Sequence, residues 1–381
     1  MSSAEAMQRA LTEVVSRGDF VVPPYPGVAL RLQRLLAREG YGVGEVADVV
    51  GADAALAANV LAAANSALLG AGSAITSVSR AVNRLGARTV GSIAIAAGVG
   101  QVATTSGVLH DVRFRVWRRS LTCALACQKL APARSLDPEE AFLAGLLHCF
   151  GRTLAIAALE QVLKTNKPPR PLSVSEWLGI AEQHRAALAR SVVEAWKLPS
   201  AVADAACAPV SSATSPLGEL VLEADRLAGD LDAGRMPQAS RPSDVPLIDA
   251  LIASVPAALQ SFAAAGPAPT QQPSPLVEKP AQVLDGELRS KKLQVVDRRS
   301  KNAAELVCLG LTPSGIVVES SRPFQESSVV RLALATATDS FEPWLSVVLC
   351  SPSAGRYRVE LQLFSPAREA REHWRALYDA P

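Results

Sequence analysis

The chain has 381 residues, more than one ordinary hydrophobic core accommodates, so two or three domains are expected. Apolar residues make up 49% of the sequence, which is enough for globular cores, and the formal net charge is only +2. A charge so close to zero excludes a global electrostatic field that would draw the chain to nucleic acid or to a membrane surface.

The six cysteines are scattered along the sequence, with no CxxC pair and no spacing typical of a disulfide framework. The sequence begins with the polar, amphipathic stretch MSSAEAMQRALTEVV, where a secreted protein would carry a charged and then apolar leader. We therefore expect a reducing, cytoplasmic location. The most apolar stretches are 90–99, which is short, and 141–159, which contains His148 and Arg152, so we expect no membrane insertion.

Residues 1 to about 235 have the pattern of an almost entirely helical region. Apolar side chains recur at spacings of three and four residues, as at Val46, Val49 and Val50. The pair Asp137-Pro138 predicts a helix start, because aspartate can cap a first turn and proline fits within it. Pro199 predicts the end of one helix and the beginning of the next.

The composition then changes twice. Residues 236–283 are rich in proline and alanine and are predicted to be a linker with a short helix. From 284 to 381 the apolar period is two, in five short runs: AELVCLGL, GIVVESS, SVVRLALAT, WLSVVLC and YRVELQLF. These runs predict a small β-barrel, and AREAREHWRALYDA predicts an amphipathic terminal helix. The predicted fold class is multidomain α + β, with an all-α domain before the barrel.

Several segments of the helical region, taken in order, resemble the HDOD family, whose members are non-enzymatic relatives of the HD phosphohydrolases. The matching segments are VPPYP at 22–26, NSA at 65–67, LG at 85–86, the stretch 137–151 and WKLP at 196–199. The resemblance covers roughly residues 15–235. It implies an N-terminal helical part in residues 1–110 and a degenerate HD-like part in residues 111–235.

The same resemblance implies where a metal site would lie. The first histidine ligand of an HD phosphohydrolase would fall at Arg119, and the defining His-Asp pair at His148 and Cys149. Of these positions, only His148 carries a side chain of the expected ligand type, and the later histidines expected near Cys207 are absent. A hydrolytic metal needs about three or more protein ligands, so we expect no bound metal, no cofactor and no catalytic residue.

Three cysteines of the helical region allow two interpretations. Cys123 and Cys127 are four residues apart and would share a helix face. Together with Cys149 they could form a zinc or redox site. We favour the alternative that each is a small buried hydrophobic residue.

The tail from about 285 to 366 resembles a PilZ domain, the family that binds cyclic di-GMP. The resemblance depends on LTPSGI at 311–316, followed by VVESSRPF and SSVVRLAL. It implies a candidate nucleotide site at Arg298, Arg299, Thr312 and Gly315. The sequence departs from the family pattern, because Ala303 replaces a further arginine and Thr312 replaces a serine.

Arg298 and Arg299 belong to a basic cluster ahead of the β region, and arginine side chains can bind phosphate with two hydrogen bonds. The other members are Arg289, Lys291, Lys292 and Lys301, and Asp297 interrupts the cluster. The cluster could also be a solvated linker end or a protein-docking surface. We expect no nucleic-acid partner, because aromatic residues are not interleaved with the basic ones.

We therefore expect a non-catalytic bacterial signalling or scaffold protein, a pseudoenzyme, whose partners are other signalling proteins. The PilZ-like tail would be a docking or sensing module. One alternative is an effector that responds to cyclic di-GMP through this tail. A second alternative is a divergent metal-dependent phosphohydrolase.

Overall fold

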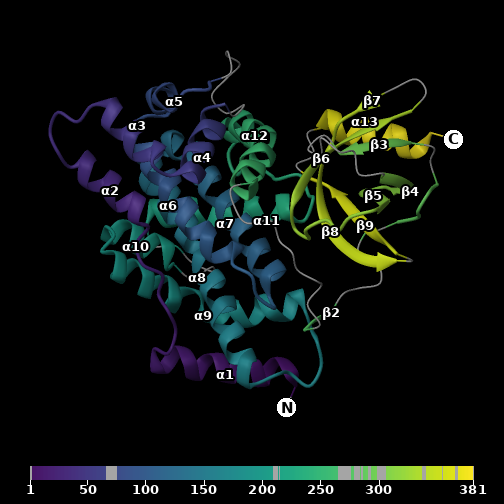
Figure 1. Cartoon of the computed structure of the whole chain (residues 1–381), viewed down its shortest axis with the longest axis horizontal. Coiled ribbons are helices and arrows are strands. Elements are labelled where there is room, and N and C mark those ends of the chain that lie inside the picture. The colour runs from purple at the N-terminus through teal and green to yellow at the C-terminus, as the bar shows by residue number, and fades with distance from the viewer. Residues whose placement is uncertain are drawn as a thin grey trace. The chain divides into compact units, whose positions relative to one another are not determined.

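The computed structural model describes residues 2–65, 75–208, 213, 215–264, 276–278, 284, 286–290, 293–297, 306–336, 340–353, 355–364 and 368–380. The chain divides into two compact units (Figure 1). The helical unit comprises Met1–Ala228 and Ala239–Glu278, and the barrel unit comprises Gly229–Gln238 and Lys279–Pro381. The described fold is thus mixed α + β, with helices first and a barrel with a terminal helix second, as the sequence predicts.

Helices account for nearly all of the regular structure before the barrel. In chain order they are α1 (Ser3–Arg17), α2 (Gly27–Leu36), α3 (Val43–Gly51), α4 (Ala54–Ala64), α5 (Val78–Leu85), α6 (Ala87–Thr104), α7 (His110–Leu130), η2 (Ala131–Arg134), α8 (Pro138–Thr165), α9 (Val174–Trp196), α10 (Ser200–Ala206), α11 (Pro216–Asp232), η3 (Pro242–Asp244) and α12 (Val245–Ala264).

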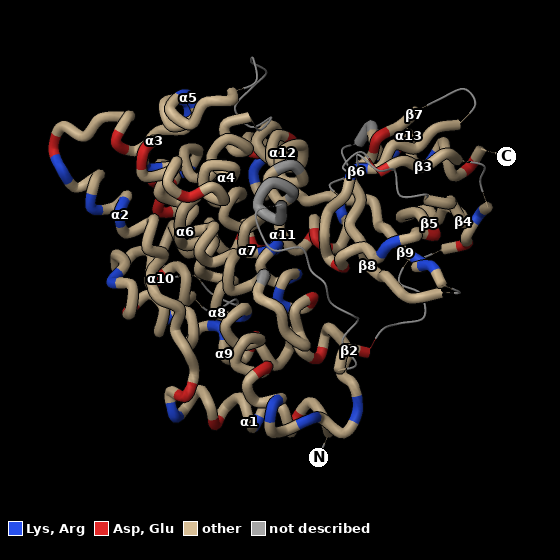
Figure 2. The backbone as a smooth tube through the Cα atoms, viewed as in Figure 1, with Lys and Arg blue, Asp and Glu red and all other residues tan. Residues whose placement is uncertain are grey.

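Helix α1 is amphipathic. Acidic and basic residues alternate along it in Figure 2, while Met7 and Leu11 are buried on its other face. Ser2 and Glu5 form a capping box at its start. Thr12 Oγ1 lies 3.1 Å from His184 Nε2 on α9, so His184 contacts α1.

Helix α8 is the centre of the helical unit and packs against α7, α9 and α10. Asp137 Oδ1 accepts hydrogen bonds from the backbone N–H groups of Glu139 and Glu140, at 2.9 and 3.0 Å, which confirms the predicted helix start. Among the described residues, α8 alone is long and apolar enough to span a membrane, but 89% of its most apolar 18-residue window is buried. We interpret α8 as a core helix.

The chain between α9 and α10 turns where the sequence predicts. Lys197 has a left-handed backbone conformation (φ 52°) and ends α9, and Pro199 precedes the first turn of α10. Asp53 caps the start of α4, since its Oδ1 accepts a hydrogen bond from Leu56 N at 2.9 Å.

The segment predicted as a linker contains more structure than a short helix. Helix α12 has 20 residues, belongs to the helical unit, and packs against α7 and α4. Its buried face consists of Ile248, Leu251, Ile252, Val255 and Leu259. The apolar stripe stabilises the helix through packing, which outweighs the local cost of Pro256 within it.

A short strand pair closes the C-terminal end of the helical unit. Strand β1 (Leu172–Ser173) pairs in parallel with β2 (Val277–Glu278). The carbonyl oxygen of Leu276 accepts hydrogen bonds from Leu172 N at 3.1 Å and from Trp177 Nε1 at 3.3 Å. The residues after the proline-rich stretch are thereby attached to the start of α9.

The barrel is a closed sheet followed by helix α13 (Arg368–Asp379). Its strands are β3 (Gln294–Asp297), β4 (Leu306–Thr312), β5 (Gly315–Ser320), β6 (Val329–Ala335), β7 (Ser340–Phe341), β8 (Trp344–Ser353) and β9 (Arg356–Leu363). The order is β3-β4-β5-β9-β8-β6-β7, and an additional β3–β6 pairing closes a barrel of six strands. Every described pairing in this sheet is antiparallel.

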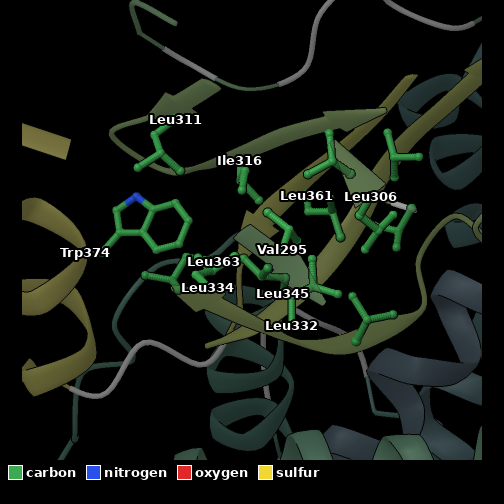
Figure 3. Close-up of a cluster of buried hydrophobic side chains, with 14 of the residues drawn as sticks. Val295, Leu306, Leu311, Ile316, Leu332, Leu334, Leu345, Leu361, Leu363 and Trp374 are labelled. Atoms are coloured by element: carbon green, nitrogen blue, oxygen red, sulfur yellow. The ribbon is translucent and has the colours of Figure 1, made fainter. Parts of the chain in front are cut away.

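The barrel core is aliphatic and is covered at one place by an aromatic side chain of α13. Figure 3 shows Trp374 among Leu311, Leu334 and Leu363. Its indole Nε1 donates a hydrogen bond of 3.0 Å to the Thr312 carbonyl oxygen. The terminal helix therefore belongs to the core of the barrel unit.

Strand β3 lies inside the segment that the sequence predicts as a basic cluster. It pairs with both β4 and β6, and Val295 and Asp297 point inward at 6% and 4% exposure. Asp297, which interrupts the basic residues, forms an ion pair of 3.0 Å with Arg322. This strand was not among the five predicted, and it completes the barrel.

Candidate functional site

The position predicted for the first metal ligand holds an ion pair. Arg119 on α7 donates to Asp225 on α11, with Nε and Nη2 each 2.8 Å from one carboxylate oxygen. The carboxylate is nearly buried at 6% exposure, and the arginine side chain is 33% exposed. Burial alone would raise the pKa of Asp225, but the hydrogen bonds and charge of Arg119 hold it well below its usual range. Asp225 is therefore charged, and both of its oxygens are occupied.

A second arginine approaches the same carboxylate from α8. Arg152 Nη1 lies 3.6 Å from Asp225 Oδ1 and 3.4 Å from Cys149 Sγ, and its Nε donates to Glu182 on α9. Cys149 Sγ in turn donates to Asp225 Oδ1 at 3.3 Å. Burial would lower the pKa of Arg152, but Cys149, Asp225 and Glu182 together raise it. Two guanidinium groups thus surround the thiol and the carboxylate.

His148 is fully buried beside a third arginine. Its Nδ1 lies 3.3 Å from the Ala206 carbonyl oxygen and 3.2 Å from Arg185 Nη1. Burial and the neighbouring Arg185 charge lower the pKa of His148 to about 4, so the ring is neutral at pH 7. Its Nε2 is buried without a hydrogen-bond partner among the described residues.

Arg185 connects α9 to the end of α10 and to the chain just after it. Its Nη1 donates to the Ala206 carbonyl oxygen at 3.2 Å, and its Nη2 donates to that of Ala208 at 2.7 Å. The close approach of α9 to α8 depends on Gly151, where an added Cβ would collide with the Arg185 carbonyl oxygen. A glycine at this position therefore places Arg185 against His148.

Three potential metal ligands do lie together. The ligand atoms of Cys123, Cys149 and Asp225 are all within 4.8 Å of one another, and all three residues are buried. Metal-binding cysteines must be thiolates, but the neighbouring thiol of Cys127 raises the pKa of Cys123, and that of Cys123 raises the pKa of Cys149.

The electrostatic surroundings oppose a cation there as well. The carboxylate oxygens of Asp225 are already paired with Arg119, and a divalent ion would meet two fixed guanidinium charges within a few ångströms. The residues present do not fit a divalent metal ion. They fit a neutral thiol pair beside a structural ion pair.

The structure brings together Arg119, His148 and Cys149, the residues that the sequence singles out in the helical unit. Sequence reasoning missed Asp225, Arg152, Glu182 and Arg185, which complete the cluster. A weak signal for Asp225 was present, because it is one of two acidic residues, with Glu223, within the apolar helix segment LVLEADRLAG. Its partner cannot be read from the sequence, since Arg119 is 106 positions away.

Of the candidate nucleotide site, the structure describes Thr312 and Gly315, and the contacts of both residues lie within the barrel sheet. Thr312 is fully buried, and its Oγ1 donates to the Gly315 carbonyl oxygen at 3.2 Å across the β4–β5 turn. A Cβ at Gly315 would collide with the Leu361 carbonyl oxygen of β9. Arg298 and Arg299 lie outside the described residues, so the structure does not place them relative to this turn.

Residues 22–209 match the family model of the HDOD domain. The helical unit therefore contains an HDOD domain, and the predicted resemblance is confirmed for this region.

A curated relative from Treponema pallidum (strain Nichols), an uncharacterized protein, is 24% identical over 192 residues. The match covers 48% of this chain, and the chain spans only 36% of that relative.

Two solved structures are similar to this chain. A protein of Shewanella amazonensis SB2B named "Putative metal-dependent phosphohydrolase" is 22% identical, with a TM-score of 0.56. The match covers 69% of this chain and 100% of that one. An HDOD domain protein with unknown function from Geobacter sulfurreducens is 21% identical, with a TM-score of 0.44 over 68% of this chain and 97% of that one. The first likeness supports the fold alone.

Proposed function

We propose that this protein is a non-catalytic signalling or scaffold protein of the bacterial cytoplasm, which binds other signalling proteins through a metal-free HDOD domain. The observation that carries the proposal is the ion pair between Arg119 and Asp225. It places a guanidinium against the carboxylate that lies beside Cys149, and both carboxylate oxygens are engaged. A metal-activated water would need those oxygens and would be repelled by the arginine charge.

The arrangement supports binding instead of turnover for a second reason. His148 is buried and neutral. The hydrogen bond with Cys127 raises the pKa of the Cys123 thiol, the hydrogen bond with Cys123 raises that of the Cys149 thiol, and burial raises both. None of these three groups is therefore poised as a nucleophile or a general base at neutral pH. What remains is a rigid helical platform whose former reaction centre is filled by side chains.

Metal analysis of the purified full-length protein tests the proposal, together with a phosphodiesterase assay on cyclic di-GMP and a phosphatase assay on p-nitrophenyl phosphate. We expect divalent metal far below one equivalent per chain and no turnover when manganese, magnesium or zinc is added. Stoichiometric metal, with turnover that Asp225→Asn abolishes, would establish the phosphohydrolase alternative.

Affinity capture of partners from the native host with full-length protein tests the binding role directly. The comparison is Arg119→Ala, which opens the ion pair and removes one partly exposed side chain, used under conditions in which circular dichroism shows the variant folded. We expect a reproducible set of signalling proteins that both forms capture. Capture of no partner by the wild-type protein, under conditions that keep it folded, would contradict the scaffold role.

For the barrel unit we propose a PilZ-like docking or sensing role. A closed six-strand barrel with a C-terminal helix supports the likeness. Binding of cyclic di-GMP stays an alternative that depends on Arg298 and Arg299, because Thr312 already uses its hydroxyl within the turn. Calorimetric titration with cyclic di-GMP tests it, with Arg298→Ala and Arg299→Ala as the variants expected to weaken binding.

A further inference from the structure

The barrel unit contains a cavity of about 450 Å³ beside α13. The β4–β5 turn, the end of β9 and one face of α13 form its walls. The residues that matter for its chemistry are Pro313, Ser314, Leu363, Arg371, Arg375 and Tyr378. This volume lies within the range of sites that bind small molecules.

Two arginines of this cavity have no acidic partner among the described residues. Arg371 Nη2 donates 2.7 Å to the Gly234 carbonyl oxygen, which leaves its other N–H groups available. Partial burial lowers the pKa of Arg371, as expected for a guanidinium whose lost hydration no carboxylate replaces. Arg375 follows four residues later on the same helix face and also lines the cavity.

The one acidic side chain in the cavity lining has its own partner. Asp379 Oδ1 lies 3.7 Å from Arg289 Nη1, and the Arg289 guanidinium stacks 4.4 Å from the ring centre of Tyr378. Arg289 thus offsets the charge of Asp379. The cavity keeps a positive charge from Arg371 and Arg375 and an apolar rim from Pro313, Leu363 and Tyr378.

We propose that this cavity binds a phosphate-bearing small molecule. Arg371 and Arg375 would hold the phosphate through paired N–H groups, with the Ser314 hydroxyl as a further donor, and the organic part would lie against the apolar rim. The site uses none of Arg298, Arg299, Thr312 and Gly315. It goes beyond the scaffold role and does not depend on the absence of metal in the helical unit.

Isothermal titration of the full-length protein with inorganic pyrophosphate and with adenosine 5′-monophosphate, at fixed ionic strength, tests this inference. Arg375→Gln is the informative variant, because Arg375 makes no ion pair or hydrogen bond in the described structure that the change would break. We expect this variant to bind at least one of the two probes about tenfold more weakly than the wild type, the loss of one charge-assisted contact. The double variant Arg371→Gln/Arg375→Gln should lose binding.

Arg331→Gln is the matched control. Arg331 is a half-exposed arginine of the same barrel that pairs with Glu342 at 3.3 Å and lies outside the cavity lining. The Arg331→Gln variant loses the same charge as Arg375→Gln, so its affinity for the two probes should equal that of the wild type. The absence of heat from both probes up to about 10 mM, or equal binding by the Arg331→Gln and Arg375→Gln variants, would overturn the inference.

Discussion

Arg119 and Asp225 meet with two parallel hydrogen bonds of 2.8 Å, at the position that the sequence resemblance predicts for a first metal ligand. A paired guanidinium and carboxylate supply opposite charges of fixed geometry, much as a cation and its ligand do. The ion pair joins α7 to α11 without requiring an ion from solution. Under the proposed function, the ion pair would supply the structural part of a metal centre without its chemistry.

Removal of this arginine should destabilise the helical unit. Arg119→Ala leaves Asp225 nearly buried with only the more distant Arg152 to offset its charge. We expect a loss of about 2 to 3 kcal/mol in the free energy of unfolding, less than for a fully buried pair because the Arg119 side chain is 33% exposed. Urea denaturation followed by circular dichroism measures it.

The control for this prediction is an ion pair of the same type at the surface. Arg17 and Glu13 pair along α1 with both side chains more than half exposed. Arg17→Ala should change stability by no more than about 0.5 kcal/mol. Equal effects of Arg17→Ala and Arg119→Ala would mean that the ion pair with Asp225 is not a structural element.

The stability of the helical unit should also decrease in mild acid because of His148. Its pKa is about 4 in the folded protein, compared with 6.5 as a reference for the unfolded chain. The unfolded chain therefore takes up the proton first, so this contribution is complete above pH 6.5 and is lost as the pH falls toward 4. The shift corresponds to roughly 3 kcal/mol across that window.

Urea midpoints between pH 4.5 and 7.5 for the wild type and for His148→Gln measure this dependence. Burial also lowers the pKa values of His110 and His184, so the variant should keep part of the slope and lose the part due to His148. Identical pH slopes in the two proteins would show that His148 is protonated with equal ease in the folded and unfolded states.

The sequence predicts the local features of the helical unit well. Asp137 caps α8 and Pro199 precedes α10, because such signals act through neighbouring backbone groups. It also identifies Arg119 and Cys149 as departures from a metal-binding pattern. It does not predict Asp225 as the partner, because that contact forms only when α7 and α11 pack together.

The underestimated length of α12 and the unpredicted strand β3 have a related cause. The prolines of α12 suggest interruptions, but its apolar face packs against α7 and α4. Strand β3 is only four residues long and lies among charged residues, so its alternation is too brief to recognise. In both cases tertiary contacts decide a structure that local preference leaves open.

Substitution of Gly151 should test the close packing that positions Arg185. A methyl group there would collide with the Arg185 carbonyl oxygen, which belongs to the backbone of α9 and cannot rotate away. Gly151→Ala should cost about 1 to 3 kcal/mol of stability through overpacking. Thermal unfolding monitored by circular dichroism measures the loss.

Gly179 on α9 is the matched control, because a methyl group added there meets no atom within 4 Å. Gly179→Ala should raise stability by about 0.5 to 1 kcal/mol, since alanine favours the helix. If both alanine variants were stabilised equally, α8 and α9 would not be as close at Gly151 as the structure places them.

Asn65 should protect a single backbone amide. Its Oδ1 accepts from Ile75 N and its Nδ2 donates to the Ile75 carbonyl oxygen, both at 2.8 Å, so one side chain holds the chain ten residues later. Asn65→Ala should therefore speed hydrogen exchange of the Ile75 amide, by about tenfold for the loss of roughly 1 kcal/mol or more. Asn65→Asp keeps the acceptor oxygen and should preserve most of the protection, as measured by amide exchange in nuclear magnetic resonance. Equally fast exchange in the aspartate and alanine variants would contradict a role for the Oδ1 contact in holding Ile75.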